Sequence, residues 1–318
     1  MKRVLITRPM PQKVVDAARE HFDVEMRDDT TPMKPGQMRG ALALHDGILP
    51  TLGDLFSADV FSEAESCRCR ILANFGVGYN HIDVEAARNA GIAVTNTPGA
   101  VTDATADIAM TLILMSARRA GEGERLVRAG RWPGWNPTQM LGLHVTGKTV
   151  GIIGMGRIGQ AIARRCHDGF GMKVVYYNRS PKAVEIEAQQ LDTPGDVAAQ
   201  ADIVVAAVPG GAETRHLIGA EFLSAMKPTA HLVNISRGDV VDEAALITAL
   251  QERRIAGAGL DVYEHEPEVP DALTAMENVV LLPHLGTAAL EVREAMGLKA
   301  VDNLRAFFAG EAPPDRVN

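Results

Sequence analysis

Cysteine and long apolar runs are scarce in this chain of 318 residues. Its three cysteines, Cys67, Cys69 and Cys166, form no disulfide framework, and the closely spaced Cys67 and Cys69 lack the second pair that a zinc site needs. No apolar run approaches the ~20 residues of a membrane helix. Residues 1–8 have too short an apolar centre for a secretory signal. We therefore expect a water-soluble cytoplasmic protein with reduced thiols, no metal site and no membrane partner.

An excess of positive charge is also absent. The chain has 32 Lys and Arg against 40 Asp and Glu, which gives a formal net charge of -8. A nucleic-acid partner requires a basic face, so we expect none, although a local anion pocket is compatible with this total. Apolar residues, in contrast, are plentiful: at 46% hydrophobic the chain can bury a core in each of two domains of ordinary size.

The middle of the chain carries a glycine-rich turn between a predicted strand, residues 149–153, and a predicted helix, residues 160–166. Gly154 suits a tight turn, Gly156 allows a pyrophosphate to approach the backbone, and Gly159 allows the helix to pack closely on the strand. The helix would direct its N-terminal amides at the diphosphate. An ordinary glycine-rich turn is the simpler alternative, but this context favours a dinucleotide site. The residues predicted to bind the cofactor here are Gly154, Met155, Gly156, Arg157, Ile158 and Gly159.

Short apolar strands alternate with helical segments along the chain, which predicts an α/β fold with parallel sheets. The sequence Thr97-Pro98-Gly99 predicts a crossing between domains, and residues 288–310 read as one helix that returns to the first domain. Residues 103–119 are apolar nearly all round, so we expect this long helix to be buried, within the chain or in a second subunit. The remaining predicted strands are residues 4–6, 24–26, 47–49, 70–75, 93–96, 172–177, 202–208, 231–235, 258–262 and 279–282, the shorter helices are residues 11–22 and 84–89, and residues 30–36 form a loop.

Two further loops are candidates for binding. Residues 76–80, Gly-Val-Gly-Tyr-Asn, follow a predicted strand at the sheet edge where ligands bind, so their backbone N–H groups can cradle an anion. A simple turn before the next helix is equally typical of such a sequence. Residues 130–137 carry both tryptophans of the chain. Loop tryptophans are typical of a covered site or an interface, and equally of aromatic rings that pack on their own domain.

The end of the second strand of the dinucleotide domain bears on the choice of cofactor. Sites for NAD have an acidic residue about 20 residues beyond the glycines, where it holds the ribose hydroxyl. Here Asn178 takes that place, and Arg179 supplies a planar cation that can grip a ribose phosphate bidentately, with Ser180 as an added hydroxyl donor. We therefore predict NADP(H) as the preferred cofactor. NAD(H) is the alternative if Arg179 is only a solvated surface residue.

Three polar residues, Arg237, Glu266 and His284, follow later predicted strands of the same domain. Singly, each is more typical of an ion pair, a helix start or a capped loop. Together they meet the needs of 2-oxo acid reduction, which requires a fixed cation for the carboxylate and carbonyl and a proton donor for the carbonyl oxygen. Arg237 can be the clamp, and His284 the acid, or the base in the oxidative direction. Glu266 can orient the imidazole and favour its protonated form.

With these motifs the chain resembles the D-isomer-specific 2-hydroxyacid dehydrogenase family over nearly its whole length. Within that family it is most similar to the NADPH-using glyoxylate/hydroxypyruvate reductases. The matching motifs are the glycine fingerprint, Gly76-Val77-Gly78, Thr105-Ala106-Asp107, Asn178-Arg179-Ser180, Pro209 with Glu213-Thr214, Asn234-Ile235-Ser236-Arg237-Gly238, Asp261-Val262-Tyr263 with Glu266-Pro267, and Pro283-His284-Leu285-Gly286. Many relatives have a histidine ahead of the proline where this chain reads Ala207-Val208-Pro209, which affects the expected contacts near the riboses.

The resemblance implies further roles. Arg237, Glu266 and His284 would be the catalytic triad, as the chemistry independently suggests. The backbone of Val77 and Gly78 would hold the substrate carboxylate. The remaining implied site residues are Leu52 and Trp135 at the substrate, the latter from its own or the neighbouring subunit, and Thr105, Val208, Pro209, Thr214, Ile235, Ser236, Asp261, His284 and Gly286 at the cofactor.

The fold implied by the resemblance has two doubly wound parallel-sheet domains, with a Rossmann cofactor domain inserted into a flavodoxin-like substrate domain. The expected boundaries are residues 1–98 for the first part of the substrate domain, 99–286 for the dinucleotide-binding domain and 287–318 for the returning helix. The family also implies a homodimer joined by the long helix after Pro98.

The predicted activity is reduction of glyoxylate or hydroxypyruvate to the D-2-hydroxy acid. Bulkier 2-oxo acids are an alternative, because pocket size depends on residues 50–52 and on the tryptophan loop. An NAD-linked phosphoglycerate-type dehydrogenase is disfavoured by Asn178. A non-catalytic dinucleotide-sensing module that binds proteins is disfavoured by the intact triad.

Overall fold

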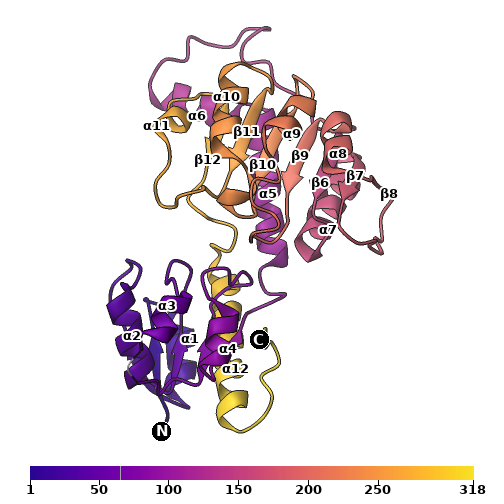
Figure 1. Cartoon of the computed structure of the whole chain (residues 1–318). Coiled ribbons are helices and arrows are strands. Elements are labelled where there is room, and N and C mark those ends of the chain that lie inside the picture. The colour runs from indigo at the N-terminus through magenta and orange to yellow at the C-terminus, as the bar shows by residue number, and fades with distance from the viewer. Residues whose placement is uncertain (65) are drawn as a thin grey trace. The chain divides into compact units, whose positions relative to one another are not determined.

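The computed structural model describes residues 1–64 and 66–318 (Figure 1). They form two compact units: residues 1–101 with 288–318, here called the flanking unit, and residues 102–287, here called the dinucleotide unit. Each unit is built on its own parallel sheet. The predicted α/β fold with one domain inserted into the other is confirmed.

The flanking unit has a five-stranded sheet of order β2-β1-β3-β4-β5, which is the flavodoxin-like order. The strands β3, β4 and β5 are apolar at nearly every residue and buried throughout, as expected for parallel strands covered on both faces. The strands are β1 Arg3–Ile6, β2 Asp23–Met26, β3 Gly47–Leu49, β4 Ile71–Ala73 and β5 Ala93–Thr95, and the helices are α1 Gln12–Arg19, α2 Pro35–Leu44, α3 Ala58–Ser62, α4 Val84–Asn89 and α12 Leu290–Phe308.

The C-terminal helix α12, yellow in Figure 1, returns to the flanking unit and packs on α1 and β4. The approach to α1 is close, because a Cβ at Gly297 would lie 2.4 Å from the side chain of Val14. Beyond the helix the chain runs beside the edge strand β5, where the N–H of Val317 donates to the carbonyl oxygen of Val94 at 2.9 Å. Helix α12 and the residues after it therefore belong to the flanking unit.

The dinucleotide unit has a seven-stranded sheet of order β12-β11-β10-β9-β6-β7-β8. The strands are β6 Thr149–Ile153, β7 Lys173–Tyr177, β8 Ala188–Gln190, β9 Ile203–Ala206, β10 His231–Asn234, β11 Gly257–Leu260 and β12 Val279–Leu281. The helical segments are α5 Thr102–Ala117, α6 Ala120–Arg128, α7 Arg157–Arg164, η1 Arg165–Gly169, α8 Pro194–Gln200, α9 Ala220–Ala225, η2 Gly238–Val240, α10 Glu243–Gln251 and α11 Asp271–Thr274.

The strand order of this sheet reverses beside β6. The chain runs outward from β6 through β7 and β8, and β9 then pairs with the opposite side of β6 before β10, β11 and β12 follow outward. Ligands of doubly wound sheets bind outside the carboxyl ends of the strands at such a reversal. The glycine fingerprint directly follows β6, so the fold places it at this point.

The long helix α5 packs within its own unit. It lies against α7 and against β10, β11 and β12, and its buried residues include Ala106, Ala109, Leu112 and Ile113. The apolar character of the segment predicted this burial. None of the helices among the described residues is long and apolar enough to cross a membrane.

The elements that were not predicted include α2, α3, α6 and β8. Helix α2 begins at Pro35, inside the predicted loop of residues 30–36, and contains the poor helix former Gly40. Burial of Met38, Ala41 and Leu42 explains why it forms nevertheless. Helix α7 begins at Arg157, three residues before the predicted start at Gln160, so the last part of the fingerprint lies in its first turn.

Candidate functional site

The fingerprint has the backbone geometry that its glycines predicted. Gly154 has φ +103°, a conformation that favours glycine. A Cβ at Gly159 would lie 2.1 Å from the carbonyl oxygen of Gly154, so α7 packs directly on the turn. Gly156, in contrast, has no atom within 4 Å of a Cβ position. Two glycines are thus required by the protein itself, and the middle one faces open space where a ligand can approach the backbone.

The two residues directly after β7 lie in different surroundings: Asn178 contacts the glycine turn, and Arg179 is exposed. Asn178 accepts from the N–H of Met155 at 3.0 Å and donates to the carbonyl oxygen of Ser180 at 2.8 Å, so it joins the fingerprint to the end of β7. Arg179 is 82% exposed and pairs with Glu213, which is itself 80% exposed. The cation predicted to recognise a phosphate is therefore accessible, with a carboxylate beside it.

Arg237, Glu266 and His284 all lie in the dinucleotide unit, beyond the carboxyl ends of the neighbouring strands β10, β11 and β12. Their segments are joined closely. A Cβ at Gly238 would lie 1.8 Å from the backbone of Tyr263, so the turn after Arg237 packs directly on the chain that leads to Glu266. The phenol of Tyr263 donates to the carbonyl oxygen of Leu282 at 2.9 Å, two residues before His284.

Glu266 and His284 form a hydrogen-bonded pair. Glu266 Oε2 lies 2.9 Å from His284 Nδ1, and the side chains are 31% and 30% exposed. The second oxygen, Oε1, accepts from the N–H of Tyr263 at 3.1 Å. Partial burial raises the pKa of Glu266, but the hydrogen bond with His284, the N–H of Tyr263 and the charge of Arg237 together bring it below its ordinary value. The carboxylate is therefore held ionised, and it directs the other ring nitrogen of His284, Nε2, away from itself.

The guanidinium of Arg237 is held against the end of its own strand. Its Nη1 donates to the carbonyl oxygen of Ser236 at 2.7 Å. Burial lowers the pKa of Arg237, although the nearby carboxylates of Glu266 and Asp239 oppose the shift. An arginine stays charged in proteins. A partly desolvated cation attracts an anion more strongly than one in water does.

Two buried residues hold the chain that follows His284. Asp261, 1% exposed, accepts from the N–H groups of Leu285 at 2.7 Å and Gly286 at 2.8 Å. Thr105 donates to the carbonyl oxygen of Gly286 at 3.2 Å. Burial raises the pKa of Asp261, opposed by those N–H groups and by His284. Both residues were predicted as cofactor contacts, and in the structure they fix the backbone beside the imidazole.

The other predicted cofactor residues form the loops after β9 and β10. Ser236 donates to the carbonyl oxygen of Val208, which joins the ends of these neighbouring strands. Thr214 donates to the carbonyl oxygen of Pro209 at 2.7 Å and closes the loop between them. Ile235 is 7% exposed and belongs to the core.

The predicted substrate residues lie in both units. Leu52, Val77 and Gly78 follow β3 and β4 of the flanking unit and are half-buried. Trp135 lies in the dinucleotide unit on the loop after α6 and is 80% exposed. Trp132 on the same loop is 54% exposed and donates from Nε1 to Gln139 at 3.2 Å.

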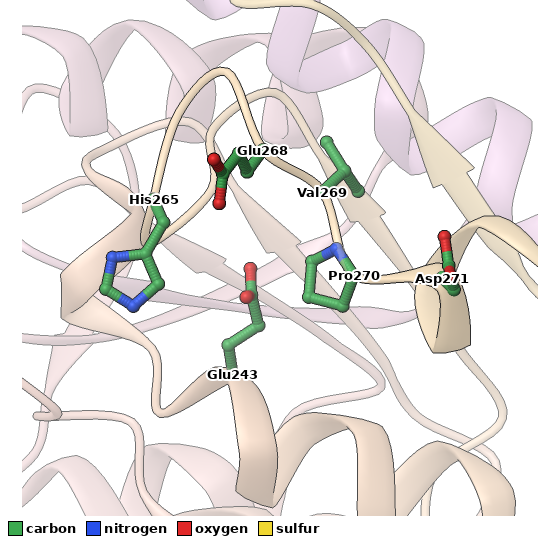
Figure 2. A pocket seen from close by; sticks show the side chains of 6 residues that line it. All are labelled: Glu243, His265, Glu268, Val269, Pro270 and Asp271. Atoms are coloured by element: carbon green, nitrogen blue, oxygen red, sulfur yellow. The ribbon is translucent and has the colours of Figure 1, made fainter.

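The loop that carries Glu266 also lines a cavity of about 290 Å³ (Figure 2). The lining residues are Glu243, His265, Glu268, Val269, Pro270 and Asp271. The side chain of Glu243 points from the start of α10 toward the loop (Figure 2), and burial raises its pKa. No residue of the triad lines this cavity. A second hollow, of about 1030 Å³, is lined by Thr149 and Lys173 at the amino ends of β6 and β7, the edge opposite the fingerprint.

Several residues that shape these sites had no role predicted from the sequence. Asn74 and Asn96 follow β4 and β5 and bind the backbone of the glycine loop at residues 76–80. Glu213 pairs with Arg179, and Tyr263 braces the triad segments. A usable signal existed for the two asparagines. They are polar residues directly after buried strands, the same signal that identified Arg237 and His284.

Comparisons with known proteins cover both units. The family model described as D-isomer specific 2-hydroxyacid dehydrogenase, NAD binding domain, matches residues 110–286. The chain is 46% identical to a glyoxylate reductase from Thermococcus gammatolerans, over 99% of this chain and 96% of that protein.

Solved structures agree with this match. The structure of an NADPH-dependent glyoxylate/hydroxypyruvate reductase from Sinorhizobium meliloti, in complex with NADP and malonate, superposes with a TM-score of 0.89 at 37% identity, over 99% of this chain and 96% of that one. A glyoxylate reductase from Paecilomyes thermophila gives a TM-score of 0.88 at 33% identity, over 99% and 98% of the two chains.

Proposed function

The chain belongs to the D-isomer-specific 2-hydroxyacid dehydrogenase family, and we propose on this premise that it reduces glyoxylate or hydroxypyruvate to the D-2-hydroxy acid with NADPH. Members of this family are NAD(P)-dependent oxidoreductases. The choice of substrate is supported by the relatives named as glyoxylate reductases. The observation that carries the catalytic part is the 2.9 Å hydrogen bond between His284 Nδ1 and Glu266 Oε2.

The geometry of the fingerprint fits a dinucleotide. The open space at Gly156 and the N-terminus of α7 suit a diphosphate. Bound NADPH would supply the hydride for the carbonyl carbon. The residues proposed to hold it are Gly154, Met155, Gly156, Arg157, Ile158, Gly159, Thr105, Asn178, Arg179, Ser180, Val208, Pro209, Thr214, Ile235, Ser236, Asp261, His284 and Gly286.

His284 is the proposed general acid. Its Nδ1–H donates to Glu266, so Nε2–H is free to donate a proton to the substrate's carbonyl oxygen as negative charge develops there. Glu266 fixes the orientation of the ring. In the oxidative direction the neutral Nε2 accepts the proton. The 30% exposure of the side chain leaves a path for exchange with solvent.

Arg237 is the proposed clamp for the substrate's carboxylate and carbonyl oxygen. Its charge is partly desolvated, and the packing of Gly238 on Tyr263 fixes the turn that carries it. The N–H groups of Val77 and Gly78 are the proposed second contact for the carboxylate. We propose that the side chains of Leu52 and Trp135 limit the size of the group that the substrate carries on its carbonyl carbon. A wider pocket at these residues would admit larger 2-oxo acids.

NADPH is the proposed cofactor because Arg179 stands exposed after β7 and no carboxylate occupies position 178. Changing Arg179→Ala should raise the Michaelis constant for NADPH by about tenfold, because the charge-assisted contact to the ribose phosphate is lost. The constant for NADH should barely change. Equal effects on the two cofactors would remove the basis for this preference and leave NAD(H) as an equal candidate.

A homodimer is also proposed. Helix α6 and the segment that follows it carry four apolar side chains that are more than half exposed, Val127, Trp132, Trp135 and Leu141. Exposed apolar side chains grouped in this way are typical of an interface. Light scattering on the purified protein should give twice the mass of one chain, and a monomer at micromolar concentration would exclude this assembly.

The decisive experiment is a panel of 2-oxo acids with both reduced cofactors, followed by absorbance of the reduced nicotinamide. Glyoxylate and hydroxypyruvate with NADPH should turn over fastest, while phosphohydroxypyruvate and branched 2-oxo acids should be poorer. Tight NADPH binding with no turnover of any 2-oxo acid would instead identify a non-catalytic sensor.

A further inference from the structure

Two asparagines hold the glycine loop of the flanking unit, residues 76–80, from behind. Asn74 follows β4 and is fully buried, and its Nδ2 donates to the carbonyl oxygens of both Gly76, at 3.1 Å, and Gly78, at 3.0 Å. Asn96 follows β5, and its Nδ2 donates to the carbonyl oxygen of Val77 at 2.9 Å. Three successive carbonyl groups of the loop are thus bound by the side-chain amides of two neighbouring strand ends.

These hydrogen bonds to the carbonyl oxygens determine the direction of the loop's N–H groups. In a planar trans peptide, a carbonyl group and the N–H of the next residue point in opposite directions. Binding the carbonyl groups of Gly76, Val77 and Gly78 therefore turns the N–H groups of Val77, Gly78 and Tyr79 away from the asparagines. Among residues 1–64 and 66–318, no group accepts a hydrogen bond from these three N–H groups. Successive N–H groups turned to one side form a cradle for an anion.

A buried histidine fixes the orientation of the Asn74 amide. Because Nδ2 donates to two carbonyl groups, Oδ1 must be the accepting atom. Oδ1 lies 2.9 Å from Nε2 of the buried His81, and because an amide oxygen only accepts, Nε2 donates at this contact. His81 directly follows the loop of residues 76–80. The segment that leaves the loop therefore fixes the side chain of Asn74, which in turn holds the loop.

We propose that Asn74 and Asn96 are positioning residues for the substrate's carboxylate, and that His81 orients Asn74. None of the three touches the substrate. They act by keeping carbonyl oxygens away from the carboxylate and N–H groups toward it. The inference rests on the proposed function, in which this loop binds the carboxylate of a 2-oxo acid. If the amides are removed, the peptides can rotate, and a carbonyl oxygen that faces the carboxylate repels it.

Three variants test this role by separating the substrate's Michaelis constant from turnover. Asn74→Ala should raise KM for glyoxylate and the inhibition constant of oxalate by about tenfold each, because the cradle loses two of its three braces. Asn96→Ala should raise both by about threefold, because one brace is lost. Asn74→Asp should have the largest effect, since a carboxylate repels both loop carbonyls and the substrate. In all three, kcat and KM for NADPH should stay within about twofold of the wild type.

Asn318→Ala is the matched control. Asn318 lies in the same unit and also donates from Nδ2 to backbone carbonyls, those of Ile92 at 2.9 Å and Val84 at 3.3 Å, but it serves the amino end of β5. It should lower the unfolding temperature as the test variants do while leaving KM for glyoxylate unchanged. If Asn74→Ala does not fold, the half-buried Asn96 decides the matter. An unchanged KM and an unchanged oxalate constant in Asn96→Ala would then overturn the inference.

The outcomes also separate this inference from the proposed function. A wild-type protein that reduces glyoxylate and is inhibited by oxalate supports the proposed function on its own. Wild-type constants in folded Asn74→Ala and Asn96→Ala would then overturn only the positioning role. A wild-type protein with neither property would remove the proposed function itself.

Discussion

The carboxyl edges of the two sheets offer ligands different kinds of group. In the dinucleotide unit, the groups proposed to act are ionisable side chains: Arg237, Glu266 and His284, which follow β10, β11 and β12. In the flanking unit, the groups proposed to act are the backbone N–H groups of residues 77–79, and the side chains that hold this loop, Asn74 and Asn96, donate to its carbonyl oxygens. In the dinucleotide unit, a substitution at one of these residues removes the functional group itself. In the flanking unit, a substitution at Asn74 or Asn96 leaves the backbone N–H groups in place and can change only their direction.

This difference predicts how each edge responds to change. A side-chain acid or cation contributes to the transition state, where charge develops, so its loss should lower kcat. A backbone cradle binds a carboxylate whose charge is the same in substrate and product. Its distortion should therefore raise KM and leave kcat nearly unchanged.

The largest expected effect is the loss of His284. Its φ of +55° makes asparagine a better replacement than alanine, because asparagine tolerates this conformation. His284→Asn should lower kcat by ~100-fold or more, since no proton donor remains for the carbonyl oxygen. Fluorescence titration should show retained NADPH binding. Near-normal turnover would show that the side chains after β10, β11 and β12 do not carry the proton transfer.

The second-largest expected effect is that of replacing Arg237 by lysine. Arg237→Lys keeps the charge but loses the planar fork that can grip carboxylate and carbonyl together, so kcat/KM for glyoxylate should fall by ~10 to 100-fold. Unlike Asn74→Ala, this variant should lose kcat as well as KM, which steady-state kinetics on both variants will reveal. If Arg237→Lys changes KM alone, the arginine belongs with the cradle as a ground-state contact.

A smaller effect, on stability, comes from Glu266. Its pKa lies below the ordinary 4.5 in the folded protein, so the ionised carboxylate favours the folded state. That contribution is complete above the unfolded pKa and is lost as pH falls through the depressed folded pKa. Wild type should therefore exceed Glu266→Gln in unfolding temperature by more at about pH 7 than at about pH 3.

Differential scanning calorimetry at the two pH values measures this gap. The backbone cradle has no titrating group among residues 77 and 78, so the same shift should be absent when Asn96→Ala is compared with wild type. A gap for Glu266→Gln that does not change with pH would contradict the ionised, His284-bonded state of this carboxylate.

The same contrast explains what the sequence could predict. The strand alternation, the fingerprint and the resemblance gave the fold class and the family, because apolar runs and glycine spacings are local patterns. The triad residues were identifiable as ionisable residues after predicted strands. The bracing of the cradle was missed, because it depends on which way an amide points across two strands. Helix α2 was missed for a related reason: burial of Met38, Ala41 and Leu42, not local propensity, makes it fold.

The smallest expected effect is that of Glu213→Gln on the binding of NADPH. It depends on whether the group that binds the ligand already has a partner within the protein. The N–H groups of the cradle have no internal acceptor among the described residues, whereas Arg179 is paired with Glu213. A carboxylate at that place competes with the ribose phosphate for the guanidinium and repels it. Because both side chains are highly exposed, the competition should be weak. Glu213→Gln should tighten NADPH binding by about threefold and leave NADH binding unchanged.

Glu277→Gln is the control for this change, since Glu277 forms a similar exposed pair with Arg125 away from the fingerprint. The measurement is fluorescence titration with both reduced cofactors at low and high salt. The gain should shrink at high salt, because screening weakens the repulsion between exposed charges. If Glu213→Gln binds NADPH no better while Arg179→Ala still discriminates between the cofactors, the pair does not persist in solution. Side-chain donors at this edge would then be as unoccupied as the backbone donors of the cradle.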